Sequence, residues 1–146
     1  MPKFSPYLYS GLVWSACLVT PLTLAADVVV SVSGMAGSSG SIGCGLFPGE
    51  RGFPMDNSVA QMVWLPADPQ GVRCVFADVV PGLYAVSVVH DLNGNRKVDT
   101  NFVGMPQEAW GVSNNVRPTL RPPRFDEAAF NVDAGRALAL DVRVGK

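Results

Sequence analysis

The sequence lacks an excess of either charge and carries few charged residues of any kind. Lysine and arginine number 11 against 12 aspartate and glutamate, so the formal net charge over 146 residues is -1, and charged residues make up 16% of the chain. Nucleic-acid-binding faces are usually strongly basic, and coiled coils and charge-driven disordered chains need more charge than this. The composition therefore argues against all three classes. The length allows one domain, and the 15 glycines and 12 prolines disfavour long helices.

An uninterrupted apolar run that could span a bilayer is also missing. The apolar stretch near the N-terminus is broken by small and polar residues, namely Ser10, Gly11, Ser15, Thr20 and Pro21, whereas a span needs about 20 mostly apolar residues. The layout is instead typical of a secretory signal peptide, with Lys3, a short apolar segment and small residues before Ala25. We expect a signal peptide over residues 1–25 and a single domain over residues 26–146, located in the periplasm or secreted.

Two other readings of this segment remain open at the level of sequence. One is a transmembrane anchor. The other is a lipid anchor through Cys17, because Trp14-Ser15-Ala16-Cys17 resembles a lipobox, although Trp14 stands where leucine is usual.

Cysteine is scarce, and removal of the signal peptide leaves only Cys44 and Cys74. An even pair in an exported chain is typical of a disulfide. Both residues lie on apolar faces of predicted strands, which is compatible with a buried bridge between neighbouring strands. Two buried thiols would be the alternative in a reducing compartment.

Residues 26–146 show a dominant period of two, which is typical of strands. The alternating segments lie near residues 28–33, 42–47, 72–76, 83–90, 128–132 and 137–144. We expect the last two to pair as a hairpin around Gly135, and single helical turns at residues 58–64 and 126–130. Short strands separated by glycine and proline predict an all-β fold, an immunoglobulin-like or prealbumin-like β-sandwich of about seven strands.

Residues 91–124 lack sustained periodicity and predict one long irregular loop. Loops of this length are usually functional or disordered, and the apolar Phe102, Val103, Met105 and Trp110 favour an ordered one.

The beginning of this loop matches a calcium-binding pattern. Asp91, Asn93, Asn95 and Asp99 occupy positions 1, 3, 5 and 9 of a calcium loop, and Lys97 falls at position 7, which binds through its backbone carbonyl. The segment resembles the loops of dockerin and related EF-hand-like repeats. Two positions depart from the pattern: Arg96 replaces the glycine of position 6, and Phe102 replaces the acidic residue of position 12. Glu108 is a candidate for the missing carboxylate.

A turn without metal is the competing interpretation, with Asp91 and Asp99 capping backbone amides. Further polar residues assigned to the same site are His90, Asn101, Ser113 and Asn114. His90 is the only histidine, and we expect its ring to hydrogen-bond into the loop. Arg117, Arg121 and Arg124 are expected to form a solvated face rather than an anion site.

Five motifs resemble the bacterial domain of unknown function 2141 family. They are Pro81-Gly82-Leu83-Tyr84-Ala85-Val86, His90-Asp91-Leu92-Asn93-Gly94-Asn95, Asp99-Thr100-Asn101, Gly104-Met105-Pro106-Gln107-Glu108 and Gly111-Val112-Ser113-Asn114-Asn115. The departures are small, with Gln107 where lysine is common and Trp110-Gly111-Val112 where Tyr-Gly-Phe is common. The resemblance implies export and a small β domain, but no activity.

These observations together predict an exported, non-catalytic β-sandwich module, for binding or structure, with a calcium-stabilised polar loop. One alternative is a metal-dependent hydrolase that uses His90, Asp91 and Glu108. Another is an adhesion or assembly domain that pairs through a sheet edge. The ligand or surface partner is not indicated, and neither a nucleic acid nor a transmembrane anchor in the mature chain is expected.

Overall fold

The computed structural model describes residues 24–146. Cys17 and all but the last two residues of the predicted signal peptide lie outside this range. The first strand begins at Ala26, the residue that follows the predicted cleavage site.

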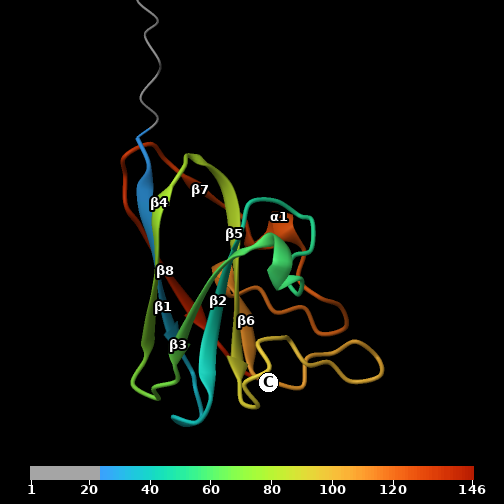
Figure 1. Ribbon diagram of the computed structural model, residues 1–146. Helices are drawn as coiled ribbons and strands as arrows, with labels where there is room; N and C mark the ends of the chain where they lie inside the picture. Colours follow the sequence, from blue (N-terminus) through green and yellow to red (C-terminus); the bar gives the residue numbers. More distant parts are fainter. Residues whose placement is uncertain (1–23) are drawn as a thin grey trace, which may run out of the picture.

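The chain folds into two β-sheets that face each other (Figure 1). The strands are β1 (Ala26–Ser33), β2 (Ser41–Phe47), β3 (Gln61–Pro66), β4 (Val72–Val79), β5 (Gly82–Asp91), β6 (Trp110–Val112), β7 (Phe130–Val132) and β8 (Leu138–Arg143). The helical segments are short: η1 (Asn57–Val59), η2 (Ser113–Asn115) and α1 (Phe125–Ala128). The prediction of an all-β sandwich is confirmed, with eight strands in the described residues.

The smaller sheet has the order β4-β1-β8. Strand β4 pairs with β1 in the antiparallel sense, whereas β8 pairs with β1 in parallel. Beyond its last paired residue, β8 continues to β6 of the other sheet, where the backbone of Gly145 exchanges two hydrogen bonds with that of Trp110. The C-terminal strand therefore closes one corner of the sandwich.

The larger sheet has the order β3-β2-β5-β6. Strand β5 is the longest, with ten residues, and it carries three partners. Its first residues, Gly82–Tyr84, pair with β7, and its later residues, Ser87–Val89, pair with β6. The end of β5 at Asp91 is the point from which the long loop leaves the sheet.

The main core fills the space between the sheets. Its fully buried side chains alternate along the strands as the period of two predicts, and they include Val28, Val30, Val32, Ile42, Phe76, Val86, Val88 and Val142. A smaller cluster covers the outer face of the larger sheet. There the rings of Phe47, Phe53 and Phe125 pack edge to face, with centroids 5.3 and 5.9 Å apart, so β2 is buried on both faces.

Three expectations about the elements are wrong. Residues 61–66 form strand β3, and only Asn57–Val59 take the helical turn expected there. Strands β7 and β8 do not pair with each other, because β7 adds to β5 and β8 adds to β1. The expected single loop over residues 91–124 is interrupted by β6 and η2 and so forms two loops, residues 92–109 and 116–124.

A disulfide joins Cys44 of β2 to Cys74 of β4 and confirms the predicted pairing. The bridge connects the two sheets, not neighbouring strands of one sheet, and both cysteines are fully buried. Disulfides persist in oxidising compartments. Within residues 24–146, no helix has the length and apolar character that crossing a membrane requires.

The bridge closes a loop between residues 30 positions apart, and we expect its removal to cost about 3–4 kcal/mol of unfolding free energy in the chain-entropy model. The double variant Cys44→Ala/Cys74→Ala should show this loss in urea denaturation under oxidising conditions. Reduced wild-type protein is the control and should approach the stability of the variant. A loss below about 1 kcal/mol would contradict the cross-link as a major source of stability.

Candidate functional site

The candidate site begins with the carboxylate of Asp91, the last residue of β5, which is completely buried. Its Oδ1 accepts a hydrogen bond from the backbone N–H of Gly94, and its Oδ2 accepts one from Arg96, both at 2.8 Å. A buried carboxylate must find hydrogen-bond donors, and here the following loop supplies them. Asp91 therefore dictates how the chain turns as it leaves the sheet.

Asn93 and Asn95 continue the turn and lead to Asp99. Each asparagine Oδ1 accepts from the backbone N–H two residues ahead, at 3.0 Å for Asn95 and 2.8 Å for Lys97. Each Nδ2 donates to the Asp99 carboxylate, which Asn95 contacts at 2.9 and 3.0 Å. The structure thus gathers the side chains predicted at positions 3, 5 and 9 around one point.

Arg96 takes the backbone conformation for which glycine is usual at position 6 of such loops. Its φ is +58°, in the left-handed region that is costly for residues with a Cβ. The Arg96 carbonyl accepts a hydrogen bond from Asn57, and its guanidinium lies 5.8 Å from the ring centroid of Trp64 on β3. These two contacts hold Arg96 against η1 and β3.

Glu108 returns to the base of the loop just before β6. Its Oε1 accepts from the backbone N–H of Leu92 at 2.8 Å, so it joins the end of the loop to its beginning. The side chain is 6% exposed, and Oε2 is buried without a hydrogen-bond partner among the described residues. A buried carboxylate oxygen without a partner is costly.

The second half of the loop is a small hairpin built on Asp99 and Asn101. The Asp99 carbonyl accepts from Gln107, and the Asn101 side-chain oxygen accepts from the N–H groups of Val103 and Met105. Asn101 therefore shapes the hairpin. Phe102, at position 12, is fully exposed to solvent.

His90 supports the loop from the sheet. Its ring is buried, and Nε2 lies 2.7 Å from the carbonyl oxygen of Ser39, so this nitrogen carries the proton. In the same turn, a Cβ at Gly40 would lie 2.2 Å from the carbonyl oxygen of Asp91. The turn between β1 and β2 thus packs closely against the end of β5.

Ser113 and Asn114, which the sequence pattern groups with this site, lie elsewhere. The buried Ser113 hydroxyl accepts from Val86 N–H and donates to the Ala128 carbonyl. Asn114 donates to the backbone carbonyls of Glu127 and Ala129. Both residues connect η2 to β5 and α1.

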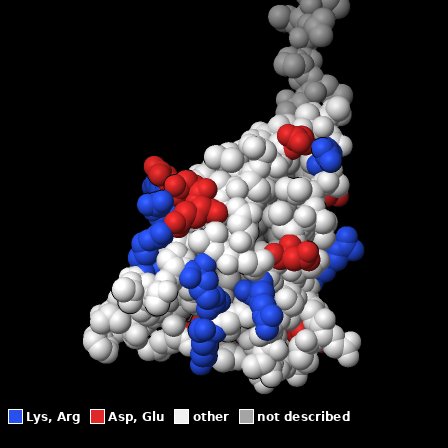
Figure 2. Space-filling view, turned by 180° about the vertical axis from the view of Figure 1, so that it is seen from behind, with Lys and Arg blue, Asp and Glu red and all other residues white. Residues whose placement is uncertain are grey.

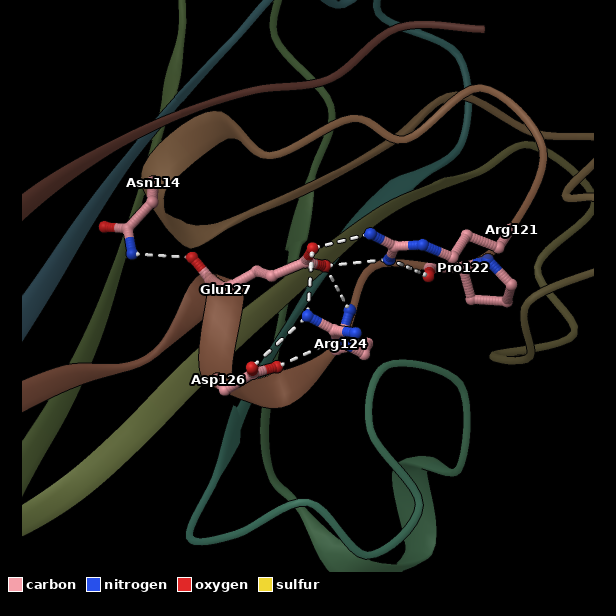
Figure 3. A network of polar contacts seen from close by, with 6 residues as sticks. All are labelled: Asn114, Arg121, Pro122, Arg124, Asp126 and Glu127. Atoms are coloured by element: carbon pink, nitrogen blue, oxygen red, sulfur yellow. Dashed lines mark hydrogen bonds and ion pairs between the residues drawn. The ribbon is translucent and has the colours of Figure 1, made fainter.

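Figure 3 shows a second polar cluster, centred on Glu127 of α1. Its carboxylate pairs with Arg121 at 2.6 Å and accepts from the backbone N–H of Arg124 at 2.9 Å. The Arg121 hydrogen bond, with that of Arg124, lowers the pKa of Glu127 to about 2. Arg124 also pairs with Asp126 at 3.2 Å. Two of the three arginines expected to face solvent are therefore held by local carboxylates, and the third, Arg117, donates to the Trp110 and Gly145 carbonyls.

The available ligands around Asp91 would be oxygens. Residues 24–146 contain no group of three or more histidine, cysteine, aspartate or glutamate side chains placed to hold a metal. The loop combines two aspartates with two asparagine amides, a set that suits a hard cation such as calcium better than zinc or copper. The sequence pattern missed the support from Asn57 and Trp64, which come from distant parts of the chain and leave no local signal.

The family comparison matches residues 30–138 to a model described as "Uncharacterized protein conserved in bacteria (DUF2141)". The match covers the whole loop and all eight strands, six of them completely and β1 and β8 in part. Neither the curated proteins nor the solved structures provide a match to the chain.

Arg96 offers a test of the left-handed position in the loop. Both Arg96→Ala and Arg96→Gly remove the contact with Trp64, but only glycine relieves the unfavourable φ. We expect the glycine variant to be about 1 kcal/mol more stable than the alanine variant, measured by urea denaturation. The same pair of substitutions at Arg136, which has no positive φ, is the control and should not favour glycine. Equal stabilities at residue 96 would argue against the conformation described.

Glu127 offers a test of the second cluster by pH. Because its pKa is lowered in the folded state, its contribution to stability is present above the ordinary glutamate pKa of about 4.3 and is lost as the pH falls towards 2. We expect Glu127→Gln to lower the melting temperature at pH 7, and the difference from wild type to shrink steadily between pH 5 and pH 2. A difference that does not vary over this range would show that the ion pair is not its source.

Proposed function

The chain belongs to the DUF2141 family, and from the geometry of its loop we propose that it is an exported, non-catalytic binding or structural module whose loop over residues 92–109 is organised by calcium. The observation that carries the proposal is the buried Oε2 of Glu108, which has no hydrogen-bond partner among the described residues. Its other oxygen accepts from the backbone N–H of Leu92, the second residue of the calcium-like turn. A cation at the base of the loop would satisfy this charge.

The side chains of the turn carry the kind of oxygen ligands that such a cation would need. Calcium takes six to eight oxygen ligands, and Asp91, Asn93, Asn95, Asp99 and Glu108 all carry side-chain oxygens, with the backbone carbonyl of Lys97 as a further candidate. Each oxygen that accepts a backbone N–H keeps a second lone pair. The side-chain amides of Asn93 and Asn95 donate hydrogen bonds to Asp99, and calcium would compete with them for its carboxylate.

Export is supported by the disulfide and by the form of the N-terminal segment. Cys44 and Cys74 are joined and buried, a state that oxidising compartments favour. The predicted signal peptide gives the route to the periplasm or the medium.

The contacts of the loop residues support a structural role more than a hydrolytic one. Asp91 is completely buried and both of its carboxylate oxygens accept from backbone N–H groups, while Nε2 of the buried His90 donates to the Ser39 carbonyl. A general base needs an atom free to reach the substrate. Pairing through a sheet edge has less support, because the edge strands β3 and β4 lie against each other.

Calcium titration combined with thermal unfolding tests the proposal. A site with a Kd of about 10⁻⁴ M, as in extracellular modules, would add about 2.7 kcal/mol to the stability at about 10 mM calcium. We expect calcium to change which of the two proteins, wild type or Glu108→Gln, is the more stable. Without calcium the variant should equal or exceed wild type, because an unpaired buried charge is removed, and with calcium it should fall below it.

Two further variants complete the test. Asp99→Asn should weaken calcium binding at least tenfold, measured by isothermal titration calorimetry. Asp68→Asn is the control, because Asp68 is an aspartate that caps the backbone N–H of Gln70 in a turn outside the loop. Its calcium response should equal that of wild type. No stabilisation of wild type at about 10 mM calcium, or equal stabilisation of wild type and Glu108→Gln, would refute the site.

A further inference from the structure

Two neighbouring loops expose large apolar side chains at their tips. Phe102 is 100% exposed and Val103 is 64% exposed at the tip of the loop between β5 and β6, and Leu120 is 92% exposed in the loop before α1. Single exposed apolar residues are ordinary on a protein surface. Several together on projecting loops mark an interaction surface.

The two tips belong to one surface. The residues that follow them, Gly104 and Met105 on one loop and Arg121 and Pro122 on the other, line the same small pocket. Figure 1 shows both loops, yellow and orange, projecting from the same side of the sandwich. Phe102, Val103 and Leu120 are called the apolar tips below.

Both loops are held in place by their own hydrogen bonds. Asn101 accepts from two backbone N–H groups across the first tip, and the Asp99 carbonyl closes the base of that hairpin. Arg121, next to Leu120, is fixed by Glu127. The apolar side chains are therefore presented on ordered supports.

The two loops that carry the apolar tips also carry exposed cations, and the carboxylates beside Leu120, those of Asp126 and Glu127, are paired with Arg121 and Arg124. Three cations that no carboxylate pairs within residues 24–146, namely Arg96, Lys97 and Arg117, are exposed. Two acidic groups at the base of the first loop, Asp91 at the end of β5 and Glu108, are buried. In Figure 2 the projecting part at the lower left is uncharged, with lysine and arginine side chains beside it. Apolar residues next to exposed cations complement an anionic lipid surface.

We propose that the apolar tips insert into the headgroup region of an anionic lipid bilayer, with the neighbouring cations on the lipid headgroups. The calcium dependence of this docking rests on the proposed calcium site. Asp99 is part of that site and also the base of the hairpin that carries Phe102 and Val103, so a cation bound there would order the hairpin and offset the negative charge at its base.

Co-sedimentation with lipid vesicles tests the proposal. Vesicles of phosphatidylcholine and phosphatidylglycerol in a ratio of about 7:3 should bind the wild-type protein in calcium, at least tenfold more weakly in EDTA, and hardly at all without phosphatidylglycerol. The double variant Phe102→Ser/Val103→Ser should bind at least tenfold more weakly than wild type, and Leu120→Ser several-fold more weakly. All proteins share the same N-terminal residues, so the differences report on the tips.

Val80→Ser is the matched control. The exposed fraction of Val80, 56%, is similar to that of Val103, 64%. Val80 precedes β5, however, and so lies about 30 Å from the loop, at the other end of that strand. Its binding should equal that of wild type. Wild-type binding to vesicles no stronger than that of the double variant would overturn the proposal. A dimer that depends on Phe102, seen by sedimentation without vesicles, would also overturn it, because the tips would then bind a second copy of the chain.

Calcium-dependent melting of the same samples separates this proposal from the previous one. A calcium shift without vesicle binding overturns the lipid surface and leaves the calcium site standing. The opposite result would be vesicle binding that requires the tips and is equally strong in EDTA, with no change of melting temperature in calcium. That result overturns the calcium site, and with it the calcium dependence proposed here.

Discussion

The carboxylate of Asp91 is placed where water does not reach, at the end of the strand with the most partners. Burial of an ionised carboxylate is affordable only when donors surround it, and the sheet has already used its own N–H groups in pairing with β2. The donors must come from the chain that follows. The N–H groups of Gly94 and Arg96 can reach both oxygens only if the backbone turns back on itself and passes through positive φ at both residues. The shape of the loop is a consequence of this one buried charge.

The same requirement extends to the rest of the sandwich. A turn held so tightly at the end of β5 needs rigid support. Residues far away in sequence supply this support. The β1–β2 turn packs on Asp91 through Gly40 and holds His90 through Ser39. Trp64 lies on Gly43, where a Cβ would come within 2.5 Å of the ring, and from there it meets Arg96. Small residues on β2 therefore make room for the aromatic ring that braces the loop.

The sequence pattern predicted the strands that alternate cleanly, because the core lies on one face of each. It failed at β3, whose residues Met62–Leu65 are all half-buried and so show no period of two. It also failed in pairing β7 with β8, because alternation defines which face of a strand is buried but not which strand lies beside it. In the loop, the ligand-like residues at alternate positions were found from local spacing. The left-handed Arg96 and its contacts with Asn57 and Trp64 depend on tertiary packing, which spacing does not encode.

The position of Glu108 changes what a cation could do in this loop. In a calcium loop with its acidic residue at position 12, the ligands close on a continuous segment, and the metal orders that segment alone. Here position 12 is Phe102, directed to solvent, and the buried carboxylate comes from the returning chain, already bonded to Leu92 at the start of the loop. A cation bound both by the turn that follows β5 and by Glu108 would join the two ends of the loop at the sheet. Because the Asp99 carbonyl also closes the base of the hairpin, a cation that fixes Asp99 would fix the hairpin as well. Phe102 and Val103 at the tip are not ligands and stay free to make contacts of their own.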